Sequence, residues 1–265
     1  MSGTFRYRWF QEALAASVRW QIRDGSNSFP AHFASGLLRE LRSDEIALLA
    51  EVEAQRRRYE EDFTRIEIHD SGSGNRFGNR RPAGTIASIA KDSAISARWG
   101  LVLYHIVTLL KPRTVLELGT NLGISAGYIL AGLKSNGDEG RLVSVEGDPT
   151  LAAKAAEQAD RFARGRCRVI PGRFQDVLPL LIREMKAIDF VFIDGHHTYD
   201  ATLANFECIR PALSQNACVL LDDIATSGGV RRAWKHIRKA MPGAVSLHLI
   251  RMGLLMVAKP DSTKA

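Results

Sequence analysis

A short apolar run that ends at a glycine turn constrains this chain more than any other feature. Residues 115–118 form that run, Gly119 and Gly123 follow four residues apart, and residues 124–133 continue as an apolar helical stretch. The run is too short for an independent helix and is bounded by glycine, which is typical of a buried parallel strand. Strand, glycine turn and helix together predict the nucleotide-binding start of a doubly wound α/β sheet.

The residues around the turn narrow the class of ligand. The chain has neither the G-x-G-x-x-G pattern of dinucleotide sites nor the G-K-[ST] of phosphate-binding loops. It has instead an acid in the first strand, Glu117, which suits a ligand with a cationic ammonium group. A second apolar run, 142–145, ends in Glu146, and an acid there can accept hydrogen bonds from ribose hydroxyls. This pattern favours S-adenosylmethionine over NAD or ATP, the alternative being a generic βαβ unit with incidental acids.

The pattern of strand and helix continues downstream. Further strands are predicted at 167–170, 189–193 and 217–221, with helices at 149–163, 177–186, 201–213 and 228–240 and a closing hairpin at 245–259. Asp176 is interpreted as the cap of its helix. Asp194 follows the fourth strand, and Asp222 and Asp223 follow the fifth. Ligands of such sheets bind outside the carboxyl ends of the strands, where all these acids are expected to lie.

Four segments in order carry a resemblance to a known family. E-L-G-T-N-L-G, V-E-G-D-P, F-I-D-G-H-H-T-Y and L-L-D-D-I resemble class I S-adenosylmethionine-dependent methyltransferases, and among them small-molecule O-methyltransferases of the catechol type and bacterial relatives with a D-G-x-H-x-Y segment. The resemblance covers about residues 85–258. It implies a doubly wound, seven-stranded, mainly parallel Rossmann-like sheet whose last strand is antiparallel, and a small hydroxylated metabolite as methyl acceptor.

The cofactor contacts are expected partly from the residues and partly from the resemblance. In the family, the turn after the third strand touches the adenine ring, which would place Phe174 over the ring and Gln175 at its amino edge. His196 is expected to face the cofactor or its loop. The full expected set is Glu117, Gly119, Thr120, Asn121, Gly123, Ser125, Glu146, Gly147, Arg173, Phe174, Gln175, Asp194 and His196.

Transfer to a hydroxyl oxygen needs alignment and removal of a proton. His197 is the candidate base, because it stands three residues after Asp194, where the catechol-type enzymes have a lysine, and histidine ordinarily titrates near neutral pH. Asp194, Asp222 and Asp223 are the candidate ligands of Mg²⁺ or another divalent cation that prefers oxygen. The family typically has Asn at the third position, whereas this chain has Asp223.

Three other interpretations stay open. The cofactor site could serve a metal-independent O-methyltransferase or an N-methyltransferase, although the N-P-P-[YF] signature of the latter is absent after the fourth strand. The aspartates could simply cap loops. A protein of another class, which binds a cofactor or nucleic acid without catalysis, is the third alternative.

Residues 1–84 are expected to form a helical extension, and residues 85–265 the catalytic domain. Within the extension, Ser43 is predicted to cap a helix that runs to about residue 63, with Arg56, Arg57 and Arg58 as its solvated end. Residues 70–82 are rich in glycine, serine and asparagine and predict either a linker or a lid over the site. A helical pattern covers residues 86–110 and ends before Pro112.

Composition excludes several classes of protein. No run of 18 apolar residues occurs, the first ten residues lack the apolar region of a signal peptide, and three widely spaced cysteines do not predict a disulfide framework. A cytoplasmic location is therefore expected. The net charge is +7, but the basic clusters fit solvated helix faces, so a nucleic-acid partner is not favoured. A homodimer is possible for such a chain because many members of the resembled family dimerise.

Overall fold

The computed structural model describes residues 12, 14–16, 32–37, 39–68, 84–137 and 139–257. A seven-stranded sheet in the order β5-β4-β3-β6-β7-β9-β8 lies at its centre. Strands β3 to β7 are parallel, β9 is antiparallel to β7, and β8 is antiparallel to β9. The expected doubly wound, mainly parallel sheet with a closing hairpin is thereby confirmed. The strands are β3 (Thr114–Leu118), β4 (Arg141–Glu146), β5 (Cys167–Pro171), β6 (Ile188–Ile193), β7 (Leu213–Leu221), β8 (Val245–Leu249) and β9 (Met252–Met256).

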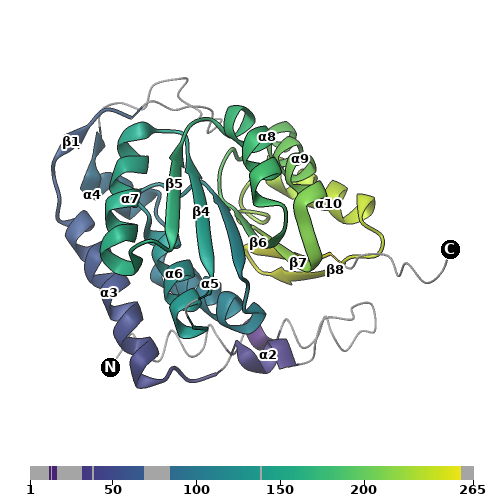
Figure 1. Cartoon of the computed structure of the whole chain (residues 1–265), viewed down its shortest axis with the longest axis horizontal. Coiled ribbons are helices and arrows are strands. Elements are labelled where there is room, and N and C mark those ends of the chain that lie inside the picture. The colour runs from purple at the N-terminus through teal and green to yellow at the C-terminus, as the bar shows by residue number, and fades with distance from the viewer. Residues whose placement is uncertain are drawn as a thin grey trace.

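Two layers of helices cover the sheet (Figure 1). One layer contains α5 (Ala97–Leu110), α6 (Ile124–Ser135) and α7 (Pro149–Ala163), and the other contains α8 (Phe174–Met185), α9 (Tyr199–Ile209) and α10 (Gly228–Ala240). A short 3-10 turn, Arg210–Ala212, follows α9. Because side chains alternate across a strand, a central strand between the layers such as β6 is mostly apolar on both faces.

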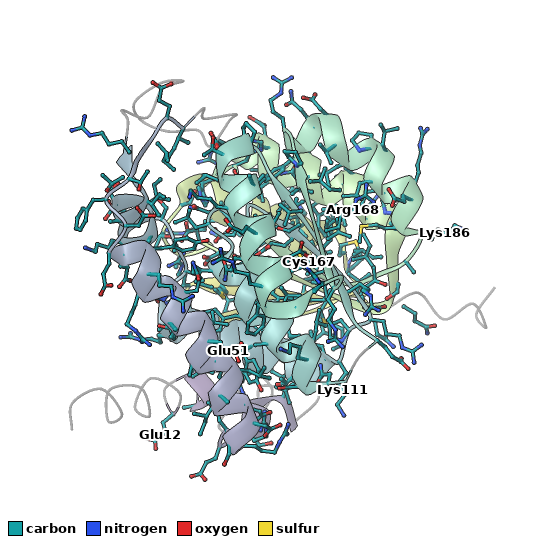
Figure 2. All side chains as sticks on the ribbon, turned by 60° about the vertical axis from the view of Figure 1, so that its left-hand side comes forward. Glu12, Glu51, Lys111, Cys167, Arg168 and Lys186 are labelled. Atoms are coloured by element: carbon teal, nitrogen blue, oxygen red, sulfur yellow. The ribbon has the colours of Figure 1, made fainter. Side chains whose placement is uncertain are left out.

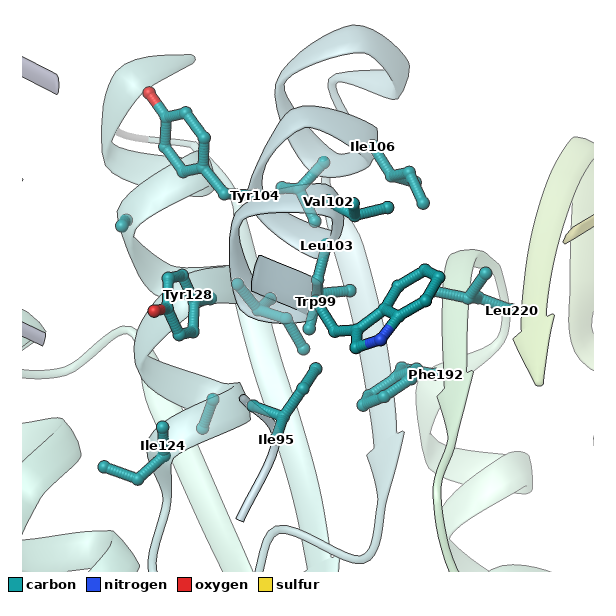
Figure 3. Close-up of a cluster of buried hydrophobic side chains, with 14 of the residues drawn as sticks. Ile95, Trp99, Val102, Leu103, Tyr104, Ile106, Ile124, Tyr128, Phe192 and Leu220 are labelled. Atoms are coloured by element: carbon teal, nitrogen blue, oxygen red, sulfur yellow. The ribbon is translucent and has the colours of Figure 1, made fainter. Parts of the chain in front are cut away.

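The alternation on β6 builds two separate cores. Phe190 and Phe192 pack into the cluster beneath α5 and α6, whereas Val191 and Ile193 pack into the cluster beneath α8, α9 and α10. Trp99 of α5 lies beside Phe192 and Leu220 in the first cluster (Figure 3). Full burial of a large apolar side chain contributes about 1.5–3 kcal/mol, so these clusters fix the strand ends at which ligands bind.

The described part of the extension packs on the helices beside the central sheet. Helix α3 (Ser43–Glu60) lies along α6, with Val52 against Gly127, and the hydroxyl of Tyr128 donates a hydrogen bond to Glu53. Glu51 lies on the exposed side of α3 (Figure 2). A shorter helix, α2 (His32–Gly36), contacts α5. The 70–82 segment expected as a lid or linker lies outside the described residues.

A small sheet crosses the expected domain boundary. Strand β1 (Arg65–Ile66) pairs antiparallel with β2 (Gly84–Thr85). The backbone of the extension is therefore hydrogen-bonded to the segment immediately before α4 (Ile86–Asp92).

Two expectations for α3 were wrong. Arg42, not Ser43, is the N-cap, and Glu45 reaches back to the Arg42 backbone amide. Glu45 is buried, and although burial opposes its ionisation, hydrogen bonds from Arg39 and the Arg42 backbone lower its pKa to about 2. Arg56 is not at a solvated end: it is buried and donates hydrogen bonds to Glu53. The buried carboxylate of Glu45 is thus paired with the guanidinium of Arg39, as a buried charge requires.

The single helix expected at 86–110 is two helices, α4 and α5. Residues 93–96 break the helical hydrogen bonding, and Ser96 is the N-cap of α5. The break places the 93–95 backbone at the carboxyl edge of the sheet, where it lines the pocket described below. No single helix in the described ranges is long and apolar enough to cross a membrane; α4 and α5 meet that test only together, across a 68° bend.

Candidate functional site

A pocket opens at the carboxyl ends of β3, β4 and β6. It brings together the glycine turn after β3, the acid that ends β4, the first turn of α8 and the loop after β6. The residues that line it are Ile68, Ile89, Ser93, Ala94, Ile95, Gly119, Thr120, Asn121, Leu122, Ile124, Ser125, Glu146, Gly147, Asp148, Leu151, Arg173, Phe174, Asp194, Gly195, His196 and His197. Ten of the thirteen expected cofactor residues are among them; Glu117, Gly123 and Gln175 are not.

The two glycines of the turn are needed for protein packing. Gly119 has a φ of 91°, and a Cβ there would lie 2.2 Å from the backbone oxygen of Asp194. Gly123 has a φ of 81°, and a Cβ there would lie 2.7 Å from the Oε1 atom of Gln158 on α7. Side chains rarely adopt such backbone angles. The first glycine therefore lets the β3 and β6 loops meet, and the second lets α6 pack on α7.

Glu146 is held at the pocket wall by backbone amides. Its carboxylate accepts hydrogen bonds from the amides of Asn121 (2.8 Å) and Asp148 (3.0 Å). Burial raises the pKa of Glu146, and these amide bonds oppose the rise. Each carboxylate oxygen can accept more than one hydrogen bond, so the group can still bind ribose hydroxyls.

One further polar atom at this wall, the buried Oδ1 atom of Asn121, has no hydrogen-bond partner among the described residues. The hydroxyl of Thr120 is buried beside it and lies near the carboxylate of Glu117. Both residues line the pocket. Buried polar atoms are normally paired, so a polar ligand such as S-adenosylmethionine fits this wall.

Glu117 lies beneath the pocket. It is fully buried in β3, and the hydroxyl of Ser144 donates a hydrogen bond of 2.6 Å to its Oε2 atom. Burial raises the pKa of Glu117, and neighbouring hydroxyl groups oppose the rise. Its other oxygen has no partner among the described residues. Glu117 was expected to contact the cofactor, but it is not among the residues that line the pocket. Its place under the turn instead makes it a support for the pocket wall.

Only some of the residues that were expected around the adenine ring of the cofactor line the pocket. The rings of Phe174 and His196 lie 4.7 Å apart at their centroids, and both residues line the pocket. Gln175 is exposed on α8 and does not reach the pocket. Helix α8 begins earlier than expected, with Arg173 as its N-cap, so Asp176 is not a cap but lies in the first turn and accepts a hydrogen bond of 2.7 Å from Arg173.

Acidic groups gather on the other side of the pocket. Asp194 directly follows β6 and is half-buried, while Asp222, which directly follows β7, is almost completely buried. Burial, followed by the charges of Asp222 and Asp223, raises the pKa of Asp194 well above its usual value. This excess of negative charge suits a cationic ligand such as a sulfonium or an ammonium group.

An arginine binds two of the three expected metal ligands. Arg251 donates from both Nε (2.7 Å to Oδ1) and a terminal nitrogen (to Oδ2) to Asp222, and its Nε lies 3.1 Å from Asp223 Oδ1. The three aspartates therefore do not fit the expected metal site, because the guanidinium cation of Arg251 already sits on Asp222 and its charge opposes a second cation there. A different group, Asp194, His197 and Asp223, has ligand atoms within 4.8 Å of one another.

His197 lies at the mouth of the pocket and is paired with an acid. Its Nδ1 atom is 3.5 Å from Asp223 Oδ2. The loop before α10 holds its backbone, because Ser227 donates a hydrogen bond of 2.8 Å to the His197 carbonyl oxygen. The side chain is 40% exposed, so the ring is accessible to a ligand in the pocket.

Sequence reasoning missed several site residues. Ile68 of the extension, Ile89 of α4 and Ile95 of the break between α4 and α5 are apolar residues that line the pocket, and Asp148 caps α7 beside it. The D-P pair at 148–149 signals such a cap. Arg251 had no local signal, because a single arginine in a hairpin turn is ordinary.

Comparisons with known proteins agree with this geometry. A family described as a methyltransferase domain matches residues 116–224. A catechol O-methyltransferase of Niastella koreensis is 33% identical over 104 residues, which cover 38% of this chain and 46% of the relative. The chain thus spans less than half the length of most of the curated relatives that it matches best.

A longer match comes from Mycobacterium tuberculosis. Its catechol O-methyltransferase is 30% identical over 156 residues, which cover 56% of this chain and 68% of the relative. The crystal structure of an O-methyltransferase from Bacillus cereus in complex with SAH has the same fold, with a TM-score of 0.56 at 20% identity over 86% of this chain and 96% of that one. The sequence relationship to the mycobacterial protein, with the strand order and pocket, shows that the chain belongs to the class I S-adenosylmethionine-dependent O-methyltransferases.

Proposed function

We propose that this protein transfers a methyl group from S-adenosylmethionine to a hydroxyl oxygen of a small metabolite. One observation carries the proposal: a single pocket unites Glu146 and the unpaired Oδ1 atom of Asn121 with Asp194 and His197. The first group suits the ribose and amino acid parts of the cofactor. The second suits its positive charge and the proton of an acceptor.

The cofactor, when bound, supplies an activated methyl group and a neutral leaving group. The protein then has to align the acceptor and remove its proton, and alignment alone can contribute about 7–11 kcal/mol. Asp194 lies where its charge can hold a cation at the tip of β6. The apolar residues Ile68, Ile89 and Ile95, which line the pocket, suit an acceptor with an apolar body beside its hydroxyl group.

His197 is the proposed general base. Asp223 faces the Nδ1 atom of His197, which leaves Nε2 to accept the acceptor's proton while the oxygen forms its bond to the methyl carbon. A carboxylate on one ring nitrogen fixes the tautomer and orientation of a catalytic histidine. The divalent cation favoured by the sequence is not part of the proposal, because Arg251 holds Asp222.

The basic face of α10 favours the enzyme over the nucleic-acid alternative. The guanidinium of Arg232 lies 5.8 Å from the ring centre of Tyr199, and that of Arg238 lies 5.8 Å from the ring centre of Trp234. These cations stack on aromatic rings of their own domain, as is common for a solvated helix face. Binding of RNA that weakens steeply with salt would reverse this preference.

Calorimetric titration of S-adenosylmethionine and of SAH into the protein tests the proposal first. We expect saturable binding of both, followed by transfer of labelled methyl groups in a panel of hydroxylated acceptors that includes catechols. Absence of cofactor binding would refute the proposal. Cofactor binding with transfer only to amines would replace oxygen by nitrogen as the acceptor atom.

A further inference from the structure

Arg251 stands where the acceptor side of the pocket meets the closing hairpin. It occupies the turn between β8 and β9, directly after Ile250, whose φ is 61°. From there its side chain reaches across β9 to the end of β7, where it bonds to Asp222 and contacts Asp223. Its side chain is 30% exposed, whereas that of Asp222 is fully buried.

We propose that the guanidinium of Arg251 is a built-in cation of this site, which excludes a divalent metal and positions the Asp223–His197 pair. The inference rests on the proposed function for the role of His197. The inference replaces the divalent metal that the resemblance to catechol-type enzymes led us to expect by an arginine side chain of the protein.

The hydrogen bonds around the two aspartates leave one oxygen for His197. Asp222 Oδ1 accepts from Arg251 Nε and from the Asp223 amide (2.7 Å), and Oδ2 accepts from a terminal nitrogen of Arg251. Asp223 Oδ1 contacts Arg251 Nε and accepts a bond of 2.6 Å from the Thr226 hydroxyl. The remaining oxygen of the pair, Asp223 Oδ2, lies 3.5 Å from His197 Nδ1.

Arginine suits the positioning of these two carboxylates better than a hydrated metal ion. Its planar guanidinium presents several N–H groups in a fixed geometry that matches carboxylates. A cation such as Mg²⁺ needs about six oxygen ligands in a regular octahedron, and here both oxygens of one aspartate and one of the other are directed to nitrogen donors. Arg251 is thus a positioning residue: it sets Asp223, and Asp223 sets the ring of His197.

A metal titration of charge variants tests this proposal. Free Mn²⁺ is followed by electron paramagnetic resonance while protein saturated with SAH is added. Arg251→Met removes the cation and keeps an apolar stem of similar length. Arg113→Met is the matched control, because Arg113 is exposed and pairs with Glu139 next to the amino end of β3, away from the pocket.

The wild type and the control are expected to leave the Mn²⁺ signal unchanged. Arg251→Met is expected to bind one Mn²⁺ at least about tenfold more tightly than the wild type, a difference of about 1.4 kcal/mol. Addition of Asp222→Asn to that variant should abolish the binding, because Asp222 is the ligand that Arg251 releases. Arg251→Lys keeps the charge and should again exclude the metal.

Two results would overturn the inference. One is stoichiometric Mn²⁺ binding by the wild type, which would place a metal on Asp194, His197 and Asp223 beside the arginine. The other is a folded Arg251→Met protein that binds SAH but no Mn²⁺, which would show that Arg251 is not what keeps a metal out. If Arg251→Met does not fold, Arg251→Gln, which can still donate to Asp222, replaces it.

The metal titration does not depend on methyl transfer. If SAH does not bind, the proposed function fails, and the Mn²⁺ titration without SAH still decides the role of Arg251. If SAH binds and the wild type takes up Mn²⁺, the cofactor assignment stands and only the inference about Arg251 is lost.

Discussion

The two halves of the pocket are built in different ways. The cofactor half comes from one continuous strand–turn–helix unit and the end of the next strand, so Gly119 and Glu146 lie only 27 residues apart in sequence. The proposed acceptor half depends on three distant segments: the loop after β6, which lines the pocket, and behind it the end of β7 and the hairpin turn that carries Arg251, which contact His197 through Asp223. The first half is fixed by local backbone geometry, and the second by side-chain charges that meet only in the folded chain.

This difference predicts how each half responds to mutation. Changes to the cofactor half should alter stability and cofactor affinity, because backbone and packing are at stake. Changes to the acceptor half should alter the catalytic rate at nearly constant cofactor affinity. The four predictions below test this contrast, from the largest expected effect to the smallest.

The largest effect is expected at His197. His197→Gln removes the base while its backbone stays held by Ser227, so kcat should fall by roughly 10²–10⁴ with little change in affinity for SAH. Steady-state kinetics and calorimetry measure the two quantities. His236→Gln, on α10 and hydrogen-bonded to Tyr199, is the control. A tenfold weaker affinity for SAH in His197→Gln would contradict the division into two halves.

Gly119→Ala should unfold or strongly destabilise the protein. The added Cβ would collide with the Asp194 backbone at a φ of 91°, and overpacking with backbone strain costs about 3–5 kcal/mol in free energy of unfolding. Urea denaturation measures the loss. Gly165→Ala, with a φ of 72° and nothing within 4 Å of the added Cβ, should cost about 1 kcal/mol. Equal losses in the two variants would mean that the β3 and β6 loops can separate freely.

Glu146→Gln should weaken cofactor binding and leave kcat at saturation nearly unchanged. The amide keeps the shape of the side chain but loses an acceptor and its charge, so the Kd for SAH should rise roughly 10- to 100-fold, or about 1.4–2.7 kcal/mol. Calorimetry compares it with Glu157→Gln, a change at an exposed residue paired with Arg161 on α7. An unchanged Kd would remove Glu146 from the cofactor site.

Glu117→Gln should raise thermal stability slightly at neutral pH. Burial raises the pKa of Glu117 in the folded chain, so the folded protein retains its proton above the unfolded value of about 4.3. Ionisation of this buried carboxyl group is unfavourable in the folded protein. The folded protein therefore loses stability as the pH rises above the pKa that the group has in the unfolded chain. Melting curves of the variant and the wild type should coincide below about pH 4 and diverge above it. If the wild type were more stable than the variant at neutral pH, the hydrogen bonds to the ionised carboxylate would outweigh the cost of burying it.

Much of the cofactor half could be predicted from the sequence, because each of its signals is local. The apolar run at 115–118, the glycines four residues apart and the acid at 146 lie within single elements whose periodicity is visible. Two of these residues have a role in the structure other than the expected contact with the cofactor: Gly123 lets α6 pack on α7, and Glu117 lies under the pocket. Sequence pattern shows residue type and spacing but not which neighbour a side chain meets.

The extension and the helical segment that follows it show where local patterns mislead. The apolar stretch 86–110 reads as one helix, yet the chain breaks at 93–96 so that α4 can pack on α3 and α5 on α6. Arg56 looks like part of a solvated basic run, but the fold buries it beside Glu53 and Tyr128. Tertiary packing overrode propensity in both places.

The sequence by itself determined the class of fold, the strand tips at which ligands bind, and the family of the chain. These properties follow from hydrophobic periodicity and from turn glycines, which act over a few residues. Only the tertiary structure decided which acids are available to a ligand. Asp222 and Asp223 are separated from Arg251 by 28 residues or more, and their pairing exists because the antiparallel β9 places the hairpin turn beside the end of β7.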